Sequence, residues 1–363
     1  MRNLMLVLLL AAMAILSLGC SQITTPAQAA APVVVAAAAP APVTAQAAAA
    51  PGISAQARKT LADGTQQLKA KQFDAAVASF QKAVALQPDL PQGYLTLGRA
   101  YSAMKDYDQT VAVLQQATKA IPNNVDLLVA LGQAHTARGF HIDPRCGSPH
   151  AGIGASPGTK DDKALRAQWI EKSNEDYRLA IAVYDQALEL HPANLAAHDG
   201  IAYASYRQGK YDDAIAWASK ALEIAPGDYG RYMTLGNSYR GLKEFDTAIA
   251  WYEKAIAVNP KEQHTYKYLW ESYAGKQDWD GAIARLTRAV DENPKNVEAM
   301  LRLGQAYARK GDLNAALGSF EKAILVDPKR GEAYAFAAPI YKKLGDKAKA
   351  EQYARSAEWY KPK

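Results

Sequence analysis

Through most of the chain, small and large apolar residues recur at the spacing of an α-helix. Gly236 and Tyr239 lie three residues apart and share one face of a helix. Ala248, Tyr252 and Ala255 follow at offsets of four and three, so they line one face of a second helix. Small residues let two helices approach closely, and the aromatic ring fills the space beside them. The pattern therefore predicts pairs of packed helices joined as hairpins.

Prolines divide this pattern into units of constant length. The series is Pro88, Pro122, Pro192, Pro226, Pro260, Pro294, Pro328 and Pro362. Every spacing is 34 residues except one of 70, which is two periods plus two, so one unit contains a 36-residue insertion. Proline lacks an amide donor and is expected to stop the second helix of each unit. A single hairpin cannot bury its apolar face alone, so the units must stack.

Positions counted back from each proline carry side chains of the same kind. An alanine lies five residues before every proline. Eight residues before the proline the side chain is usually larger: Phe80, Leu114, Tyr184, Tyr252, Leu286 and Phe320, with Ala218 and Ala354 as exceptions. Twenty-four residues before it glycine is frequent: Gly64, Gly98, Gly132, Gly236 and Gly304. These positions predict the seam between the two helices of each hairpin.

This pattern resembles the tetratricopeptide repeat, TPR. The resemblance covers residues 57 to 363 as eight units, and we place the TPR solenoid at residues 53–363. It implies an all-α fold, a right-handed superhelical solenoid of about eight helix-turn-helix hairpins. Trp270 departs from the pattern, because it occupies a position where glycine is usual. Either the sixth hairpin opens locally or the ring points into the groove. The polar last helix is typical of a terminal cap.

The insertion lies inside the third unit, at residues 139–174. Gly139 to Lys160 is rich in glycine and proline and predicts a loop. Asp161 to Lys172 predicts a helix, with Thr159 as its N-cap. Either Asn174 caps a fresh second helix of the unit, or the two stretches form one helix of about 30 residues, roughly 45 Å long.

The loop carries four side chains that can ligate metals. His141, Asp143, Cys146 and His150 lie within ten residues, and zinc and copper favour such groups. The cluster is isolated and has no paired C-x-x-C motif, so we predict no metal site and no cofactor. The plain interpretation is an exposed loop with a free thiol. A metal- or redox-dependent role of residues 141–150 remains the alternative.

The N-terminus predicts an export signal at residues 1–19. Arg2 is followed by the apolar run Leu4 to Leu18, which is too short to span a bilayer as a stable helix. Ser17-Leu18-Gly19-Cys20 resembles a bacterial lipoprotein box, which implies a lipid attached to Cys20. The resemblance also implies an outer-membrane location facing the periplasm. The alternative is cleavage after Ala29, which would give a soluble periplasmic or secreted protein.

A low-complexity stretch connects this signal to the repeats. Residues 20–52 are nearly all Ala, Pro, Val, Gln and Thr, and their prolines interrupt any long alanine helix. The stretch has too little bulky apolar surface to fold alone. We therefore predict a disordered tether that holds the repeats away from a membrane surface.

Composition and motifs exclude several classes of protein. Apolar residues make up 49% of the 363 residues, which excludes global disorder. The net charge of +6, from 42 basic and 36 acidic residues, gives little support for nucleic-acid binding. Two cysteines cannot form a disulfide framework. The sequence has no nucleophile elbow, P-loop or H-E-x-x-H motif, so we predict that the protein is not an enzyme.

In TPR proteins, first-helix residues that point away from the second helix line the concave surface. The resemblance therefore implies a partner-binding groove at Arg99, Tyr203, Tyr206, Arg207, Asn237, Arg240, Lys267, Tyr268, Arg302, Gln305 and Arg309. This set is basic and partly aromatic, which favours a peptide or protein partner with acidic character. We expect a non-enzymatic interaction scaffold in the bacterial cell envelope. Binding of an acidic polysaccharide during export is a further alternative.

Overall fold

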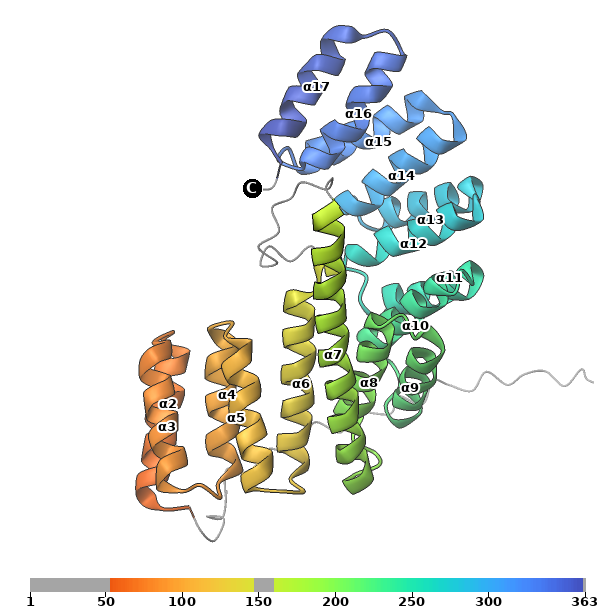
Figure 1. The fold of residues 1–363 in the computed structure, drawn as a ribbon. Coiled ribbons are helices and arrows are strands. Elements are labelled where there is room, and N and C mark those ends of the chain that lie inside the picture. The colour runs from red at the N-terminus through yellow and green to blue at the C-terminus, as the bar shows by residue number, and fades with distance from the viewer. Residues whose placement is uncertain (1–52, 147–159, 362–363) are drawn as a thin grey trace, which may run out of the picture. The chain divides into compact units, whose positions relative to one another are not determined.

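A computed structural model describes residues 53–146 and 160–361 (Figure 1). The chain divides into two units, residues 1–52 and 53–363. The predicted export signal, Cys20 and the tether lie outside the described residues. In the second unit the described residues form sixteen α-helices and one short 3₁₀ helix, with no strand among them. The prediction of an all-α solenoid is confirmed.

The helices form eight consecutive pairs. Their bounds are α2 (Ala55–Lys69) and α3 (Phe73–Leu86), α4 (Pro91–Ala103) and α5 (Tyr107–Ala120), α6 (Val125–Ile142) and α7 (Lys160–Leu190), α8 (Leu195–Arg207) and α9 (Tyr211–Ile224), α10 (Tyr229–Gly241) and α11 (Phe245–Val258), α12 (His264–Lys276) and α13 (Trp279–Glu292), α14 (Val297–Lys310) and α15 (Leu313–Val326), and α16 (Gly331–Lys343) and α17 (Lys347–Trp359). The 3₁₀ helix η1 (Pro144–Cys146) follows α6. Each helix packs against the next along the chain, and each first helix also contacts the first helix of the following unit (Figure 1).

Prolines end the second helices and polar caps begin many of the first ones. In units one to seven the second helix ends two residues before its proline, as α9 does at Ile224 before Pro226. The side chain of Asn194 accepts a hydrogen bond of 3.0 Å from the backbone N–H of Ala197 at the start of α8. This bond satisfies one of the amide donors that a helix N-terminus leaves unpaired.

A glycine opposite a ring brings the two helices of a hairpin together. A Cβ atom at Gly236 would lie 2.5 Å from Cε1 of Tyr252, and one at Gly304 would lie 2.5 Å from Cε1 of Phe320. Both distances are far shorter than a carbon–carbon contact, so only glycine permits the approach. The predicted pairing of a small residue with a large one across the seam is confirmed.

The sixth hairpin is open. In every other unit the first and second helices pack closely along their length. α12 packs less closely against α13 than this and makes more extensive contact with α14. The indole of Trp270 lies under the guanidinium of Arg302 on α14, 5.8 Å from the ring centroid to Cζ. The hairpin is therefore open at Trp270, which is the first of the two alternatives predicted, and the ring contacts the following first helix, α14.

The helix before the insertion is longer than the sequence predicted. α6 continues through Gly139 to Ile142, where a loop was expected. A Cβ atom at Gly139 would lie 3.1 Å from Cβ of Asp176 and 3.1 Å from Cε1 of Tyr177 on α7. Gly139 therefore permits close contact between α6 and α7 and does not end the helix.

After the insertion, one helix replaces the two predicted stretches. α7 runs unbroken for 31 residues, about 46 Å, so the second of the two alternatives is correct. Asn174 lies inside this helix, and its Oδ1 atom accepts a hydrogen bond of 3.2 Å from Nη2 of Arg145. Thr159, the predicted cap, lies outside the described residues. None of the described helices combines the length and the apolar character that crossing a membrane requires.

Candidate partner-binding site

The predicted groove residues all lie on first helices. Arg99 is on α4; Tyr203, Tyr206 and Arg207 are on α8; Asn237 and Arg240 are on α10; Lys267 and Tyr268 are on α12; Arg302, Gln305 and Arg309 are on α14. Because α8, α10, α12 and α14 contact one another in that order, these helices bring ten of the residues together. Arg99 stands apart, since α6 separates α4 from α8. We call the exposed face of α8, α10 and α12 the A-helix surface.

Arg240 is the centre of the A-helix surface. Its Nε donates to the hydroxyl of Tyr252 at 3.2 Å, and its Nη1 donates to Glu271 at 2.8 Å. The guanidinium also lies 5.2 Å from the centroid of the Tyr268 ring, within the range of a cation–π contact. The Tyr252 hydroxyl in turn donates to Oδ1 of Asn237 at 2.8 Å. Four first-helix residues and one buried tyrosine are thus joined in one network.

The ionisation of this network is fixed around neutral pH. Burial raises the pKa of Tyr252 and that of Tyr206, so both phenols keep their protons. Burial by itself would lower the pKa of Arg240, but the Tyr252 oxygen and the Glu271 carboxylate outweigh it and raise that pKa. The Arg240 charge acts in the opposite direction on the pKa of Tyr206 and is outweighed by burial. The centre of the surface is a cation that Glu271 and Tyr252 hold against the aromatic ring of Tyr268.

Half of the six predicted basic side chains are bound to carboxylates of the chain itself. Arg207 donates to Asp143 at 2.6 Å, and Nε of Arg302 donates to Glu298 at 2.7 Å, as Arg240 does to Glu271. Arg99, Lys267 and Arg309 are exposed. The A-helix surface therefore presents less unpaired positive charge than its residue types suggest. Its role in binding a partner stays a prediction.

An open pocket of about 380 Å³ lies between α8, α9 and α10. Its lining includes Ala202, Tyr203, Tyr206, Ala218, Met233 and Asn237. Ala218 is the residue eight before the proline of unit four, where six other units have a bulky side chain. The missing side chain leaves the space unfilled. We call this cavity the unit-four pocket.

The other alanine exception has the same consequence. A pocket of about 400 Å³ in unit eight is lined by Ala338, Ala350 and Ala354, and Ala354 is the second residue that breaks the bulky position. The pockets were not predicted from the sequence. The signal that reveals them is an alanine at a position where the repeat otherwise has a large side chain.

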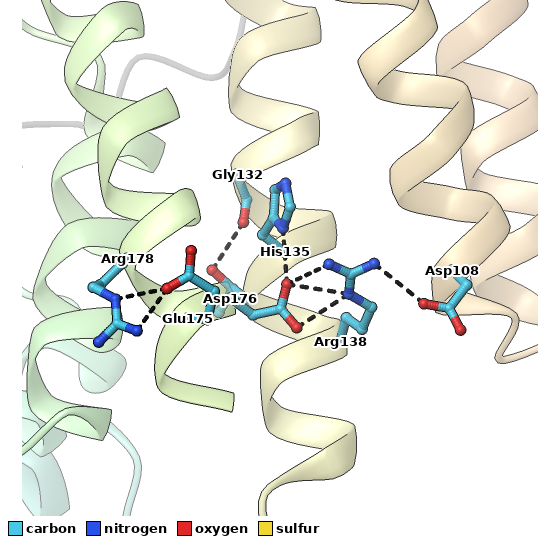
Figure 2. Close-up of polar contacts among 8 residues, drawn as sticks. Asp108, Gly132, His135, Arg138, Glu175, Asp176 and Arg178 are labelled. Atoms are coloured by element: carbon cyan, nitrogen blue, oxygen red, sulfur yellow. Dashed lines mark hydrogen bonds and ion pairs between the residues drawn. The ribbon is translucent and has the colours of Figure 1, made fainter. Parts of the chain in front are cut away.

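A buried ion-pair cluster fixes the insertion helix to the third unit (Figure 2). Asp176 of α7 has 2% of its side chain exposed and lies 2.9 Å from Nδ1 of His135 on α6. Arg138, one helical turn further along α6, donates to the same carboxylate at 2.6 Å and to Asp108 of α5 at 3.1 Å. No local sequence pattern marks this cluster, because α6 and α7 contribute residues about 40 positions apart.

Electrostatics keeps the Asp176 carboxylate ionised. Burial by itself would raise the pKa of Asp176, but the hydrogen bonds from His135 and Arg138 outweigh it and lower that pKa. The hydrogen bond to Asp176 also raises the pKa of Arg138. The cluster is therefore a charged link between three successive helices and is best explained as structural.

The predicted metal-ligand loop is described only in part. Asp143 is fully buried, and its carboxylate accepts hydrogen bonds of 2.8 Å from Arg145 and 2.6 Å from Arg207. Burial would raise the pKa of Asp143, but these two guanidinium groups lower it. The His141 ring lies 4.8 Å from that of Tyr107. Within the described residues no group of three or more potential ligands could hold a metal. The Cys146 side chain and His150 lie outside those residues.

Comparison with known families identifies the class. Models described as tetratricopeptide repeat match residues 67–131, 170–229, 231–262 and 271–333. The chain belongs to the tetratricopeptide repeat family. Proteins of this family bind peptide or protein partners and are generally non-enzymatic, so membership supports a protein–protein interaction scaffold. No curated protein matches the chain.

Solved structures of similar fold are distant in sequence. A tetratricopeptide repeat protein from Parabacteroides merdae ATCC 43184 is 12% identical with a TM-score of 0.50, over 79% of this chain and 99% of that chain. TTC0263, a thermophilic TPR protein in Thermus thermophilus, is 18% identical with a TM-score of 0.41, over 60% and 99%. YrrB, described as a TPR protein with an unusual peptide-binding site, is 23% identical with a TM-score of 0.36, over 49% and 92%. At 12% identity and a TM-score of 0.50, the likeness to the Parabacteroides merdae protein concerns the fold alone.

Proposed function

We propose that this chain is a non-enzymatic docking protein of the bacterial cell envelope that holds a segment of a partner protein on the A-helix surface. The observation that carries the proposal is the network around Arg240. It combines a cation that is held in place with the ring of Tyr268 on the neighbouring helix α12, while α8 contributes Tyr206 to the same surface. Arginine and tyrosine are the side chains that most often anchor protein interfaces.

The held geometry favours binding of a partner segment. Side chains that are already fixed lose little conformational entropy when a partner binds. Because Tyr252, Glu271 and Asn237 orient the Arg240 network before binding, the surface is preorganised. The Tyr206 phenol stays protonated and can exchange hydrogen bonds with a partner backbone, while the rings of Tyr206 and Tyr268 supply apolar contact area. One ridge of first-helix side chains thus offers both polar and aromatic contacts.

Peptides selected from a random library against the full chain test this surface. We expect Tyr268→Ala and Arg240→Ala each to weaken binding of the selected peptides by about tenfold or more, the size typical of interface anchors. Dissociation constants from fluorescence anisotropy would measure the effect. Arg288→Ala is the matched control, because Arg288 also pairs with a carboxylate, Glu292, but lies on the second helix α13. Selected peptides whose affinity is the same in all three variants would contradict the proposal.

The envelope location and the lipid anchor belong to the same proposal. They are supported by the short apolar run after Arg2 and by Ser17-Leu18-Gly19-Cys20, which resembles a lipoprotein box. The Ala/Pro-rich stretch at residues 20–52 would then separate the repeats from the membrane. Such an anchor would concentrate the docking surface beside the envelope.

Replacing Cys20 with alanine should release the protein from membranes. Without the thiol no lipid can be attached, so most of the protein should move from the membrane fraction to the soluble fraction of cells that express it. Cell fractionation and incorporation of labelled palmitate measure the two consequences. Cys146→Ala, which removes the only other cysteine, should leave both unchanged. Membrane retention of the Cys20 variant would count against the anchor.

A further inference from the structure

The unit-four pocket occupies the place of a ring that other units possess. In unit five the Tyr252 ring fills the space between Gly236 and Tyr268, and it stacks on Tyr268 at a centroid distance of 6.1 Å. In unit seven Phe320 lies in the same way against Phe336, at 5.7 Å. Moving back one 34-residue repeat from unit five leads to Ala218, Ala202 and Thr234, and all three line the unit-four pocket.

We propose that the unit-four pocket binds one aromatic side chain, a phenylalanine or tyrosine, of the partner segment held on the A-helix surface. This inference rests on the proposed function and adds what the partner must carry. The pocket, at about 380 Å³, is within the size range of natural ligand sites. Ala202, Ala218 and Met233 give it an apolar interior that matches a ring.

Polar groups around the pocket suit a phenol. In unit five the Tyr252 hydroxyl donates to Asn237 and accepts from Arg240. The positions equivalent to Asn237 and Arg240 in unit four are Tyr203 and Tyr206, and both line the pocket. Hydroxyls donate as well as accept, so they can satisfy the hydroxyl of a bound tyrosine or face the edge of a phenylalanine. The entering ring would thus find hydrogen-bonding groups where Tyr252 has them, but it would lie less deep than Tyr252, because Ala202 stands where unit five has Gly236.

The ring must come from another molecule. The residues outside the described part of the chain, 1–52, 147–159 and 362–363, include no phenylalanine, tyrosine or tryptophan. The pocket is also continuous with the A-helix surface, because Tyr203, Tyr206 and Asn237 belong to both. A segment that contacts Arg240 and Tyr206 therefore passes the pocket opening. This continuity argues for the partner segment as the source of the ring.

Filling the pocket with a side chain of the protein itself gives the sharpest test. Ala218→Leu restores the residue type of Leu114 and Leu286, and Ala218→Phe, combined throughout with Ala202→Gly to make room for the ring, restores that of Phe80 and Phe320. The probe is p-cresol, the side-chain analogue of tyrosine, with binding followed by two-dimensional NMR of the full chain. We expect saturable binding to the wild-type chain and at least about tenfold weaker binding to either variant. Ala354→Phe, which fills the unit-eight pocket, is the matched control and should retain the binding.

A double-mutant cycle with the library-selected peptides links the pocket to the partner. We expect the peptides to share an aromatic residue. Replacing that residue with alanine should weaken peptide binding as much as Ala218→Phe does, and combining the two changes should weaken binding no further. Variants with an unchanged or higher melting temperature show that the fold is intact, and the leucine variant serves if the phenylalanine variant does not fold.

The outcomes separate this inference from the proposed function. Peptides that lose affinity with Tyr268→Ala but not with Ala218→Phe or Ala218→Leu would overturn the aromatic subsite and leave the docking function standing. Absence of p-cresol binding to the wild-type chain would also overturn the subsite. A third outcome is that no peptide binds, while p-cresol binds the wild-type chain and not the Ala218→Phe variant. The pocket would then accept a ring, and the docking function would fail. Peptide-independent dimerisation abolished by Ala218→Phe would show that a second copy supplies the ring, and would overturn the partner assignment.

Discussion

Replacing Asp176 with alanine should lower the free energy of unfolding around the third unit by about 3 kcal/mol. Removing one partner of a buried ion pair leaves the other charge uncompensated, which typically costs about 3–5 kcal/mol. The lower end applies because the Arg138 side chain is 25% exposed and can recover some hydration. In stacked repeats each unit contacts only its neighbours, so the loss should be local. Hydrogen exchange of the α6 and α7 amides measures it, together with urea denaturation.

Asp108 provides the matched control for this prediction. It pairs with the same arginine, but its side chain is 88% exposed, so Asp108→Ala should cost less than about 0.5 kcal/mol. Acid should discriminate further between the two variants. The pKa of Asp176 is lowered on folding, so its contribution is complete above about pH 4, the unfolded carboxyl value, and is lost as the pH falls through the folded pKa. The Asp176→Ala chain should therefore lose less stability between pH 5 and pH 2 than the Asp108→Ala chain. Equal effects of the two changes would show that the buried link is unimportant.

The hairpins were predictable because their signals are local and repeated. A proline stops each second helix through its own missing amide, and Gly236 faces Tyr252 within a single unit. Neither feature depends on distant parts of the chain. Each of these positions is a weak indication by itself, but together they recur over eight units. The fold can therefore be predicted from the spacing of prolines, small residues and rings.

The charge state of the A-helix surface could have been inferred in part. Arg240 bonds to Glu271, and Arg330 bonds to Glu298. The partners are 31 and 32 residues apart, slightly less than one repeat, so each pair joins successive units of the solenoid. A search for opposite charges at that spacing would have found these pairs. It would also have shown that few arginines remain to attract an acidic partner.

The contacts of the insertion could not be inferred in this way. Asp143 accepts from Arg207 and Asp176 from Arg138, and neither spacing is set by the repeat. Which residues meet depends on how far α6 continues past Gly139 and on the register of the long helix α7 against it. Gly139 resembles a helix stop in the sequence, while its function in the fold is close packing. A departure from a periodic pattern marks a position but does not reveal its partners.

Tyr184→Ala should be the most destabilising single truncation in the third unit, at about 3–5 kcal/mol of unfolding free energy. The ring is 1% exposed, and a Cβ atom at Gly132 of α6 would lie 2.5 Å from its Cε1 atom. A Cβ atom at Gly200 of α8 would collide with the same ring, so Tyr184 packs units three and four together. Its burial also raises its pKa to about 12. Urea denaturation and hydrogen exchange of α6 and α8 measure the loss.

Trp359→Ala is the control, because it also removes a large aromatic ring. That ring is 82% exposed, so its loss should lower the free energy of unfolding by less than about 0.5 kcal/mol. Tyr184→Ala also creates in unit three the alanine that unit four already has at Ala218. If the ring in this position defines the interior of a hairpin, the truncated chain should gain a cavity that binds p-cresol, and p-cresol should raise its melting temperature by mass action. A Tyr184→Ala chain as stable as wild type, or one indifferent to p-cresol, would mean that the neighbouring helices close over the space. The open pocket at Ala218 would then require an explanation other than the missing ring.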